Sequence, residues 1–264
     1  ISAMISCVDG FSHGEQNCRV CFKQSYPIPW HDKGVVVFED RKDRWLLRPN
    51  PGYWGDAAPK VLVLGFSKGG DQQRMIDLYE RGRRSYEDIP FNSETGSMRR
   101  ALAEIFWAMG LIKDGHPIDN LFASGNHGFG FASLVRCSIT IDPIGKENDI
   151  LPKTMKSSPP FLGECANRFA VNLPQSVRLI ILLNAEKQYI EFCRKQLVGA
   201  KISEKEYAYK IASATVVHVP NPSGQAAGYR KVFIGARPPN SREKNMLICR
   251  EEVIPLVREV LDLF

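Results

Sequence analysis

The chain has 264 residues, enough to bury a substantial core in one large domain or two small ones. Hydrophobic residues make up 44% and charged residues 24% of the sequence, which argues against gross disorder. The formal net charge of +6 suits an anionic partner such as nucleic acid. No long apolar run and no basic, apolar leader is present, so neither a membrane span nor a signal peptide is predicted. We expect a cytoplasmic monomer with one domain, residues 1–264.

The first 59 residues are predicted to form an irregular arm that contains a small hairpin. Polar, turn-rich sequence extends to about residue 33. Short strands are predicted at 35–38 and 44–47, on either side of a charged turn. A loop rich in proline, glycine and aromatic residues, Pro49–Pro59, then leads into the core.

Strands and helices alternate through residues 60–264. Apolar runs predict strands that are covered on both faces, at Val61–Leu64, Ala132–Ile139, Val177–Leu183 and Thr215–Val219. Helices are predicted at about 96–110, 161–172, 185–197 and 241–262. This alternation predicts an α/β fold, a three-layer α/β/α sandwich with a central four-stranded parallel sheet.

The most informative loop follows the last predicted strand and reads His218-Val219-Pro220-Asn221-Pro222-Ser223-Gly224. Its two prolines make it stiff and leave it few backbone donors. It therefore presents small polar groups beyond the carboxyl end of a strand, which is where ligands bind in open α/β sheets. A proline-rich exit turn without a binding role has the same composition.

A second loop of this kind follows the first core strand and reads Gly65-Phe66-Ser67-Lys68-Gly69-Gly70-Asp71. Glycines after a strand let backbone amides approach a phosphate or a base, and Lys68 brings a positive charge. Neither a Walker loop nor a GxGxxG fingerprint is present.

Taken in order, four segments resemble the motifs of the uracil-DNA glycosylase superfamily. Gly65–Gly69 takes the place of the loop that activates water, and Pro90-Phe91 that of the base-stacking segment. Ser133-Leu134-Val135-Arg136-Cys137 matches the strand that reads the base, and Asn221–Gly224 matches the final loop of mismatch-specific relatives. The resemblance extends from about residue 18 to the end. It implies a DNA repair enzyme that hydrolyses the N-glycosidic bond of a flipped-out deaminated base, uracil or a related one.

The resemblance also implies roles for individual residues. Those expected at the reaction are Ser67, Asp71, Asn221 and His218. Those expected at the base are Phe66, Phe91 and Ser133, and those at the DNA backbone are Lys68, Ser223 and Gly224. Of the two candidate donors to the departing base we favour Asn221, because His218 lies at the strand end, where it packs in the sheet. Tyr229 is the nearest candidate for a wedge that displaces the base.

The chain departs from the family pattern at two places. Relatives carry Asp, Asn or Glu in the first loop, where this chain has Phe66 and Ser67, and a hydroxyl takes a proton from water less readily than a carboxylate. Ser133 replaces a base-reading amide by one hydroxyl. Two other hypotheses therefore stay open: a catalytically weak nucleic-acid-binding module on the same fold, and an α/β enzyme that acts on a nucleotide. Candidate phosphate contacts are Arg81, Arg83, Arg84, Arg99 and Arg100.

Seven cysteines without an export signal point to thiols or metal ligands before disulfides. Some branches of the superfamily carry an iron–sulfur cluster of the 4Fe–4S type. The resemblance places its ligands at Cys18, Cys21, Cys137 and Cys165. Residue types also suit a zinc site made of Cys7, His13, Cys18 and Cys21, and buried thiols without a metal are the third interpretation.

Overall fold

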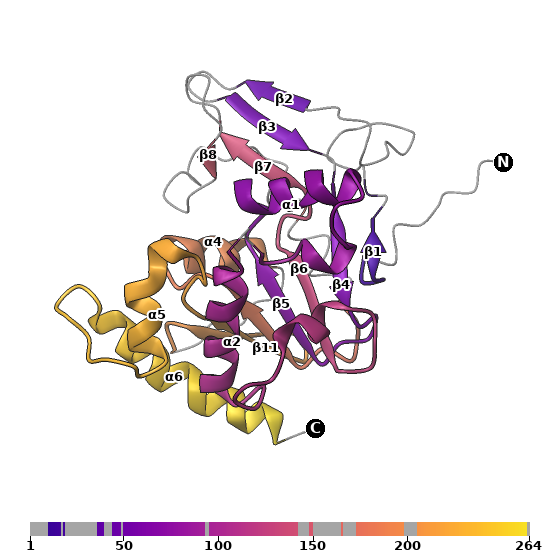
Figure 1. The fold of residues 1–264 in the computed structure, drawn as a ribbon. Coiled ribbons are helices and arrows are strands. Elements are labelled where there is room, and N and C mark those ends of the chain that lie inside the picture. The colour runs from indigo at the N-terminus through magenta and orange to yellow at the C-terminus, as the bar shows by residue number, and fades with distance from the viewer. Residues whose placement is uncertain are drawn as a thin grey trace.

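The computed structural model describes residues 10–16, 18, 36–39, 44–48, 50–92, 95–141, 148–149, 165, 173–197 and 205–262. Within these ranges the main sheet has seven strands in the order β1-β4-β6-β5-β9-β11-β10 (Figure 1). Their bounds are β1 Gly14–Glu15, β4 Gly52–Gly55, β5 Val61–Gly65, β6 Phe129–Ser133, β9 Leu179–Leu182, β10 Ala208–Ile211 and β11 Ala214–His218.

The centre of this sheet is parallel. β6, β5, β9 and β11 pair in parallel, with Val61 opposite both Phe129 and Leu179, and Leu179 opposite Thr215. The predicted four-stranded parallel sheet is therefore confirmed as the middle of a wider sheet. Antiparallel strands extend it, β4 and β1 at one edge and β10 at the other. Because β1 and β4 come from the first 59 residues, part of the predicted arm belongs to the core sheet.

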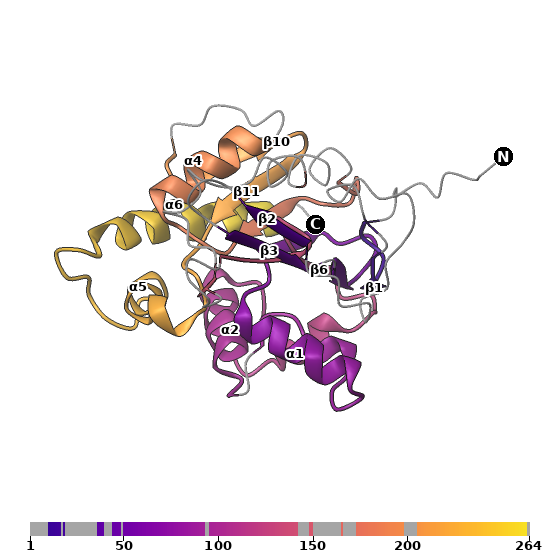
Figure 2. The same cartoon turned by 90° about the horizontal axis from the view of Figure 1, so that it is seen from above.

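Helices cover both faces of the sheet, which confirms the three layers (Figure 2). Val61 and Val63 pack on one face with apolar residues of α1, α2, α5 and α6, whereas Leu62 and Leu64 pack on the other face with α4. This alternation is the period of two that a strand imposes on its side chains. The helices are α1 Gly70–Glu80, α2 Ser97–Met109, α4 Lys187–Gln196, α5 Ala227–Phe233 and α6 Lys244–Leu261, with 3₁₀ turns η3 Tyr86–Asp88, η4 Ile118–Phe122 and η6 Gly224–Ala226.

A second, antiparallel sheet lies beyond the carboxyl end of β5 (Figure 1). It contains β2 Val36–Glu39, β3 Arg44–Arg48, β7 Ser138–Ile141 and β8 Asn148–Asp149. The predicted hairpin is confirmed, because β2 and β3 pair with Val36 opposite Leu47. Its third strand, β7, was not expected.

The predicted strand at Ala132–Ile139 is wrong. β6 ends at Ser133, the next residues turn away, and β7 begins at Ser138 in the other sheet. The apolar run looked like one strand because the end of β6, the turn after it and the start of β7 are all buried. An apolar run shows burial, and it does not show where the chain bends.

Three of the predicted helices agree with α2, α4 and α6 to within about three residues at each end. The predicted helix at 161–172 lies outside the described residues except for Cys165. Two of the described helices, α1 and α5, were not predicted. Among the described helices, none is long and apolar enough to cross a membrane.

Candidate functional site at the carboxyl edge of the sheet

The loops selected from the sequence start at one edge of the sheet. Because β6, β5, β9 and β11 are parallel, their carboxyl ends lie at the same edge. Backbone hydrogen bonds continue between the loops: the Leu134 amide donates to the Gly65 carbonyl (2.7 Å) and the Val219 amide to the Leu182 carbonyl (3.0 Å). This edge is where an open α/β sheet binds its ligand.

A cavity of about 370 Å³ opens at this edge beside the ends of β9 and β11. Asn221 Oδ1 accepts a hydrogen bond from the Ser223 amide (2.9 Å), and Asn184 Oδ1 accepts one from the Glu186 amide (2.8 Å). Each turn fixes the oxygen of one side-chain amide and leaves its NH₂ group as a donor. The lining residues are Asn184, Ala185, Glu186, Pro220, Asn221, Ser223, Ala226, Tyr229, Asn245 and Met246.

His218 supports this cavity from inside the sheet. Its side chain is fully buried, its Nδ1 donates to the Asn184 carbonyl (2.9 Å), and its Nε2 accepts from Tyr209 Oη (3.3 Å). Burial lowers the pKa of His218 to about 3, so the imidazole is neutral. The expectation that His218 packs in the sheet is confirmed, and it holds the backbone at Asn184 in place.

Phe66 and Phe91 lie on opposite faces of the sheet. The Phe66 ring contacts Tyr189 and Phe192 on the α4 side, each with centroids 5.9 Å apart. The Phe91 ring is 5% exposed and packs against Phe122 and Phe131 on the other face. The structure therefore does not bring these two rings to one base, and Phe91 is a core aromatic in this arrangement.

The other residues of the first loop face different surroundings. Ser67 is half-buried, and Asp71 is exposed in the first turn of α1. Lys68 is fully buried, and its Nζ donates to the backbone carbonyl of Arg136. Burial lowers the pKa of Lys68 to about 8, and the Cys137 thiol acts in the opposite direction. The predicted contact of Lys68 with the DNA backbone is not available here, because the ammonium group lies inside the protein.

Ser133 is also buried, at the end of β6 opposite Gly65. It lines an apolar space of about 20 Å³ together with Leu62, Leu64 and other residues. Such a space is close to the size of a single water molecule. The structure therefore does not show Ser133 reading a base.

Arg99 has a structural position rather than a phosphate-facing one. Its guanidinium donates to the carbonyls of Pro90 (3.1 Å) and Glu87 and pairs with Asp119 (2.5 Å). It is 6% exposed, so it fastens the segment that precedes Phe91. The remaining predicted phosphate contacts are exposed, namely Arg81, Arg83, Arg84 and Arg100.

Three of the four cysteines predicted to hold a cluster gather around Arg136. The Arg136 amide lies 3.5 Å from Cys165 Sγ, and Cys137 is its neighbour in the chain. Burial lowers the pKa of Arg136 to about 10, while the thiols of Cys165 and Cys18 act to raise it. Positions far apart in the sequence thus share one neighbourhood, and the fourth predicted ligand, Cys21, lies outside the described residues.

The thiols suit a sulfur-ligated metal in chemical type. Cys137 and Cys165 are buried and Cys18 is half-buried, as expected for a site between an arm and a core. In the part of the chain that the structure describes, no three His, Cys, Asp or Glu side chains are close enough together to hold a metal ion. A site of four cysteines would therefore need Cys21 and a closer arrangement of the three described cysteines than the structure shows.

The histidine of the alternative zinc site is already engaged. His13 Nδ1 accepts from the Gly55 amide (3.2 Å), and its Nε2 donates to Glu87 Oε1 (3.2 Å). That site would also use Cys7, Cys18 and Cys21. Of these, Cys7 and Cys21 lie outside the described residues. His13 would therefore have to release one of its two partners, Gly55 or Glu87, in order to bind zinc.

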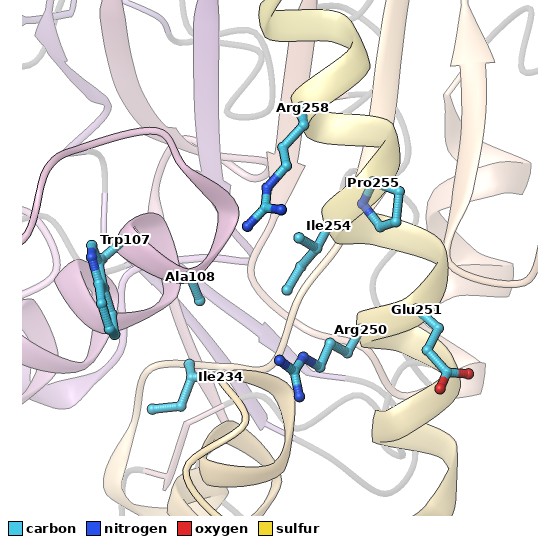
Figure 3. Close-up of a pocket in the computed structure, with 8 residues that line it drawn as sticks. All are labelled: Trp107, Ala108, Ile234, Arg250, Glu251, Ile254, Pro255 and Arg258. Atoms are coloured by element: carbon cyan, nitrogen blue, oxygen red, sulfur yellow. The ribbon is translucent and has the colours of Figure 1, made fainter.

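A second cavity, of about 450 Å³, lies between α2, α6 and the end of α5. Figure 3 shows the guanidinium groups of Arg250 and Arg258 directed from α6 towards the opposing elements, and Trp107 and Ala108 of α2 line the other side. No residue selected from the sequence lines this cavity. It is separate from the candidate site.

Sequence reasoning missed Asn184, Glu186 and Asn245, which also line the cavity at the carboxyl edge. A signal for the first two was present, because Asn184-Ala185-Glu186 directly follows the third apolar run. Ligands of open α/β sheets bind at the carboxyl ends of the strands. Examining the residues after every predicted strand, and not only after the strands with family motifs, would have selected Asn184 and Glu186. Comparison with models of known protein families and with curated proteins finds no match for this chain.

Proposed function

We propose that this protein is a DNA glycosylase that hydrolyses the N-glycosidic bond of a flipped-out deaminated base, uracil or a related one. The observation that carries the proposal is the cavity at the carboxyl edge, where Asn221 and Asn184 each keep an NH₂ donor. Its volume of about 370 Å³ is in the range of small-ligand sites. A base inside a duplex cannot enter such a cavity, so it must first leave the stack.

The amide donors suit the charge that develops during this reaction. As the bond to the sugar breaks, negative charge grows on the departing base and positive charge on the sugar. Fixed NH₂ groups at Asn221 and Asn184 would stabilise the negative charge on a carbonyl oxygen of the base. The turns that hold both amide oxygens keep these donors from rotating.

Glu186 is the carboxylate among the residues that line the cavity. It is exposed and is the N-cap residue of α4, in the loop that follows β9. A carboxylate takes a proton from water more readily than the hydroxyl of Ser67. Glu186 therefore takes the water-positioning role that the family pattern gives to the first loop, ahead of Asp71 on α1.

DNA would reach the cavity along the same edge. Ser223 lines the cavity and Gly224 begins η6, so a hydroxyl and nearby backbone amides are available to a phosphate. Arg81, Arg83 and Arg84 are exposed, and the chain has a net charge of +6. These charges support binding to DNA whose strength falls as salt rises.

We also propose that Cys18, Cys21, Cys137 and Cys165 hold an iron–sulfur cluster. The gathering of the three described cysteines around Arg136 supports this set. When bound, the cluster would cross-link the amino-terminal arm to the core. A brown preparation that contains iron and acid-labile sulfide is expected, whereas a colourless preparation that contains zinc would reject the cluster.

Excision is tested with oligonucleotides that carry uracil, hypoxanthine or xanthine, by measuring abasic sites. Asn221→Asp keeps the oxygen that accepts from Ser223 but removes the NH₂ donor. It should lower the excision rate roughly 10²- to 10³-fold, the effect of removing one donor to a developing negative charge. Glu186→Gln should lower the rate more than the matched variant Asp71→Asn. No cleavage of any of these substrates by the unaltered protein would reject the enzymatic proposal.

A specific observation favours a second function, a nucleic-acid-binding module without catalysis. Phe91 and Ser133 are buried and line no part of the cavity that contains Asn221. A protein of this kind would bind DNA with a strong dependence on salt and would leave every glycosidic bond intact. Binding and cleavage measured on the same oligonucleotides separate the two functions.

A further inference from the structure

The cavity between α2, α6 and the end of α5 receives two arginines from one face of α6. Arg250, Ile254 and Arg258 follow one another at a spacing of four residues, which makes them neighbours along the helix surface. Figure 3 shows that both guanidinium groups are directed from this face towards the elements opposite. The cavity volume of about 450 Å³ lies in the range of sites for small ligands.

Each of the two arginines lies near a glycine at the C-terminal end of another helix. A Cβ atom at Gly235, just after α5, would be 2.6 Å from Nη1 and 2.7 Å from Nη2 of Arg250. A Cβ atom at Gly110, the C-cap of α2, would be 4.0 Å from Nε of Arg258. The absence of a side chain at Gly235 therefore gives the Arg250 guanidinium its place beside the backbone.

Both guanidinium groups keep donors that a ligand can use. Among the described residues, neither Arg250 nor Arg258 forms an ion pair or a hydrogen bond. Glu251 is the carboxylate among the lining residues, and it pairs with neither arginine. A guanidinium presents its N–H groups as a rigid fork that matches a carboxylate or a phosphate. The excess of positive charge therefore favours an anion.

Apart from these three charged residues, the lining of the cavity is apolar. Trp107 is exposed, Ile234 is half-buried and Ile254 is buried. Exposed apolar surface beside a cavity is surface that a ligand can cover, and an indole ring stacks on other aromatic rings. The lining therefore suits a molecule that has an aromatic body as well as a negative charge.

We propose that this cavity binds a small organic anion, an aromatic molecule that carries a phosphate or carboxylate group. Arg250 and Arg258 would bind the anionic group, and Trp107, Ile234 and Ile254 would contact the aromatic body. The proposal goes beyond base excision and is independent of it, because no residue lines both this cavity and the one that contains Asn221.

Calorimetric titration at pH 7 with four probes tests the two halves of the ligand separately. 1-Naphthyl phosphate and 1-naphthoate have both the rings and the charge, 1-naphthol has only the rings, and inorganic phosphate has only the charge. At least one of the two naphthyl anions should bind with a Kd of about 1 mM or tighter. 1-Naphthol and inorganic phosphate should each bind roughly tenfold more weakly or less, because each lacks one set of contacts.

Charge variants show whether the probes bind in this cavity. Arg250→Gln and Arg258→Gln should each weaken binding of the naphthyl anion roughly tenfold, because each removes charged donors. The control is Arg242→Gln, an exposed position that does not line the cavity, and it should change nothing. Glu251→Gln should strengthen binding roughly twofold to fivefold, because a negative charge beside the anion is lost.

Trp107→Ala tests the aromatic contact. It should weaken binding of the naphthyl anion roughly twofold to tenfold, the effect of losing one aromatic pair, and leave inorganic phosphate unaffected. Urea denaturation of every variant separates a structural role, because arginines that only stabilise the ends of α2 and α5 would lower the denaturant midpoint without changing affinity. If Arg250→Gln does not fold, Arg250→Lys keeps the charge, loses the fork and should still weaken binding.

Three results would overturn the proposal: no saturable binding of either naphthyl anion, equal affinity for 1-naphthol or inorganic phosphate, or an affinity that neither arginine change lowers. If this face instead joined two copies of the chain, the mass in solution would rise with concentration and fall in Arg250→Gln. That result without probe binding would also overturn the proposal. Absence of excision would leave these measurements interpretable, because none of them uses DNA.

Discussion

The ring of Phe91 lies on the backbone of Gly65. A Cβ atom at residue 65 would be 3.1 Å from Cε1 of that ring, closer than ordinary van der Waals contact. Phe91 itself has a φ of 48°, a left-handed conformation that a residue with a side chain adopts only when its surroundings hold it there. The contact with Gly65 and the packing against Phe122 and Phe131 therefore keep this segment at the carboxyl edge.

Gly65→Ala should destabilise the protein by about 1 to 3 kcal/mol, the usual cost of adding a methyl group to a filled core. The new Cβ must push the Phe91 ring away from its position. Urea denaturation gives the free energy of unfolding. The control is Gly224→Ala, where a Cβ would have nothing within 4 Å, and it should change that free energy by less than about 0.5 kcal/mol. Equal effects of the two changes would contradict the packing described here.

Arg99 offers a second test of how this segment is held. Arg99→Met removes the donors to the buried Pro90 carbonyl and to the partly buried Glu87 carbonyl. The expected loss is about 2 to 4 kcal/mol of the free energy of unfolding. Arg100→Met, at an exposed position of the same helix, should change it by less than about 0.5 kcal/mol.

Hydrogen exchange locates the effect of the Arg99 change. Amides at 86–92 should lose protection in Arg99→Met, because its guanidinium is the link between α2 and this segment. Amides in β9 should still exchange only through global unfolding, so their protection should fall only by the loss in the free energy of unfolding. If Arg99 instead served mainly to bind phosphate, its replacement would weaken DNA binding and leave both stability and exchange unchanged.

Helices and strands whose apolar residues recur at a regular spacing could be predicted from the sequence. Leu102, Ile105, Phe106 and Met109 recur at helical spacing, and α2 buries all four and is capped by Gly110. The bend after Ser133 could not be predicted, because Leu134 and Val135 remain buried after they leave the strand. Apolar character reports burial in either case, and only long-range pairing decides which sheet receives the next residues.

The sequence predicted which loops lie at the candidate site, but it did not predict which of their side chains face the cavity. The loops after β5 and β11 lie at one edge, as parallel strands require. Whether a polar side chain on such a loop faces solvent or the interior depends on tertiary neighbours. Lys68 was expected at DNA and is buried beside Arg136, while Asn184 and Glu186 line the cavity without belonging to any recognised motif.

His218 makes the stability of the fold depend on pH. Its pKa is about 3 in the folded protein, because burial disfavours the imidazolium, against 6.5 for an ordinary histidine. Between these values the unfolded chain binds a proton that the folded protein does not. The free energy of unfolding should therefore fall as pH drops below about 6.5, by up to about 1.4 kcal/mol per pH unit, and the fall should be complete near pH 3. Above pH 6.5 this histidine contributes no dependence.

His218→Gln removes the titrating group while keeping a polar side chain beside the Asn184 carbonyl. The free energy of unfolding, measured in urea from pH 7 to pH 4, should fall less steeply in this variant. The difference in slope should approach about 1.4 kcal/mol per pH unit, the value for one proton taken up on unfolding. His116→Gln, at an exposed position, should keep the slope of the unaltered protein. Since the variant also loses ring packing against Tyr189 and Tyr209, its stability at pH 7 should be lower, and the slope is the diagnostic quantity. Identical slopes for His218→Gln and the unaltered protein would show that the imidazole is not held neutral in the sheet.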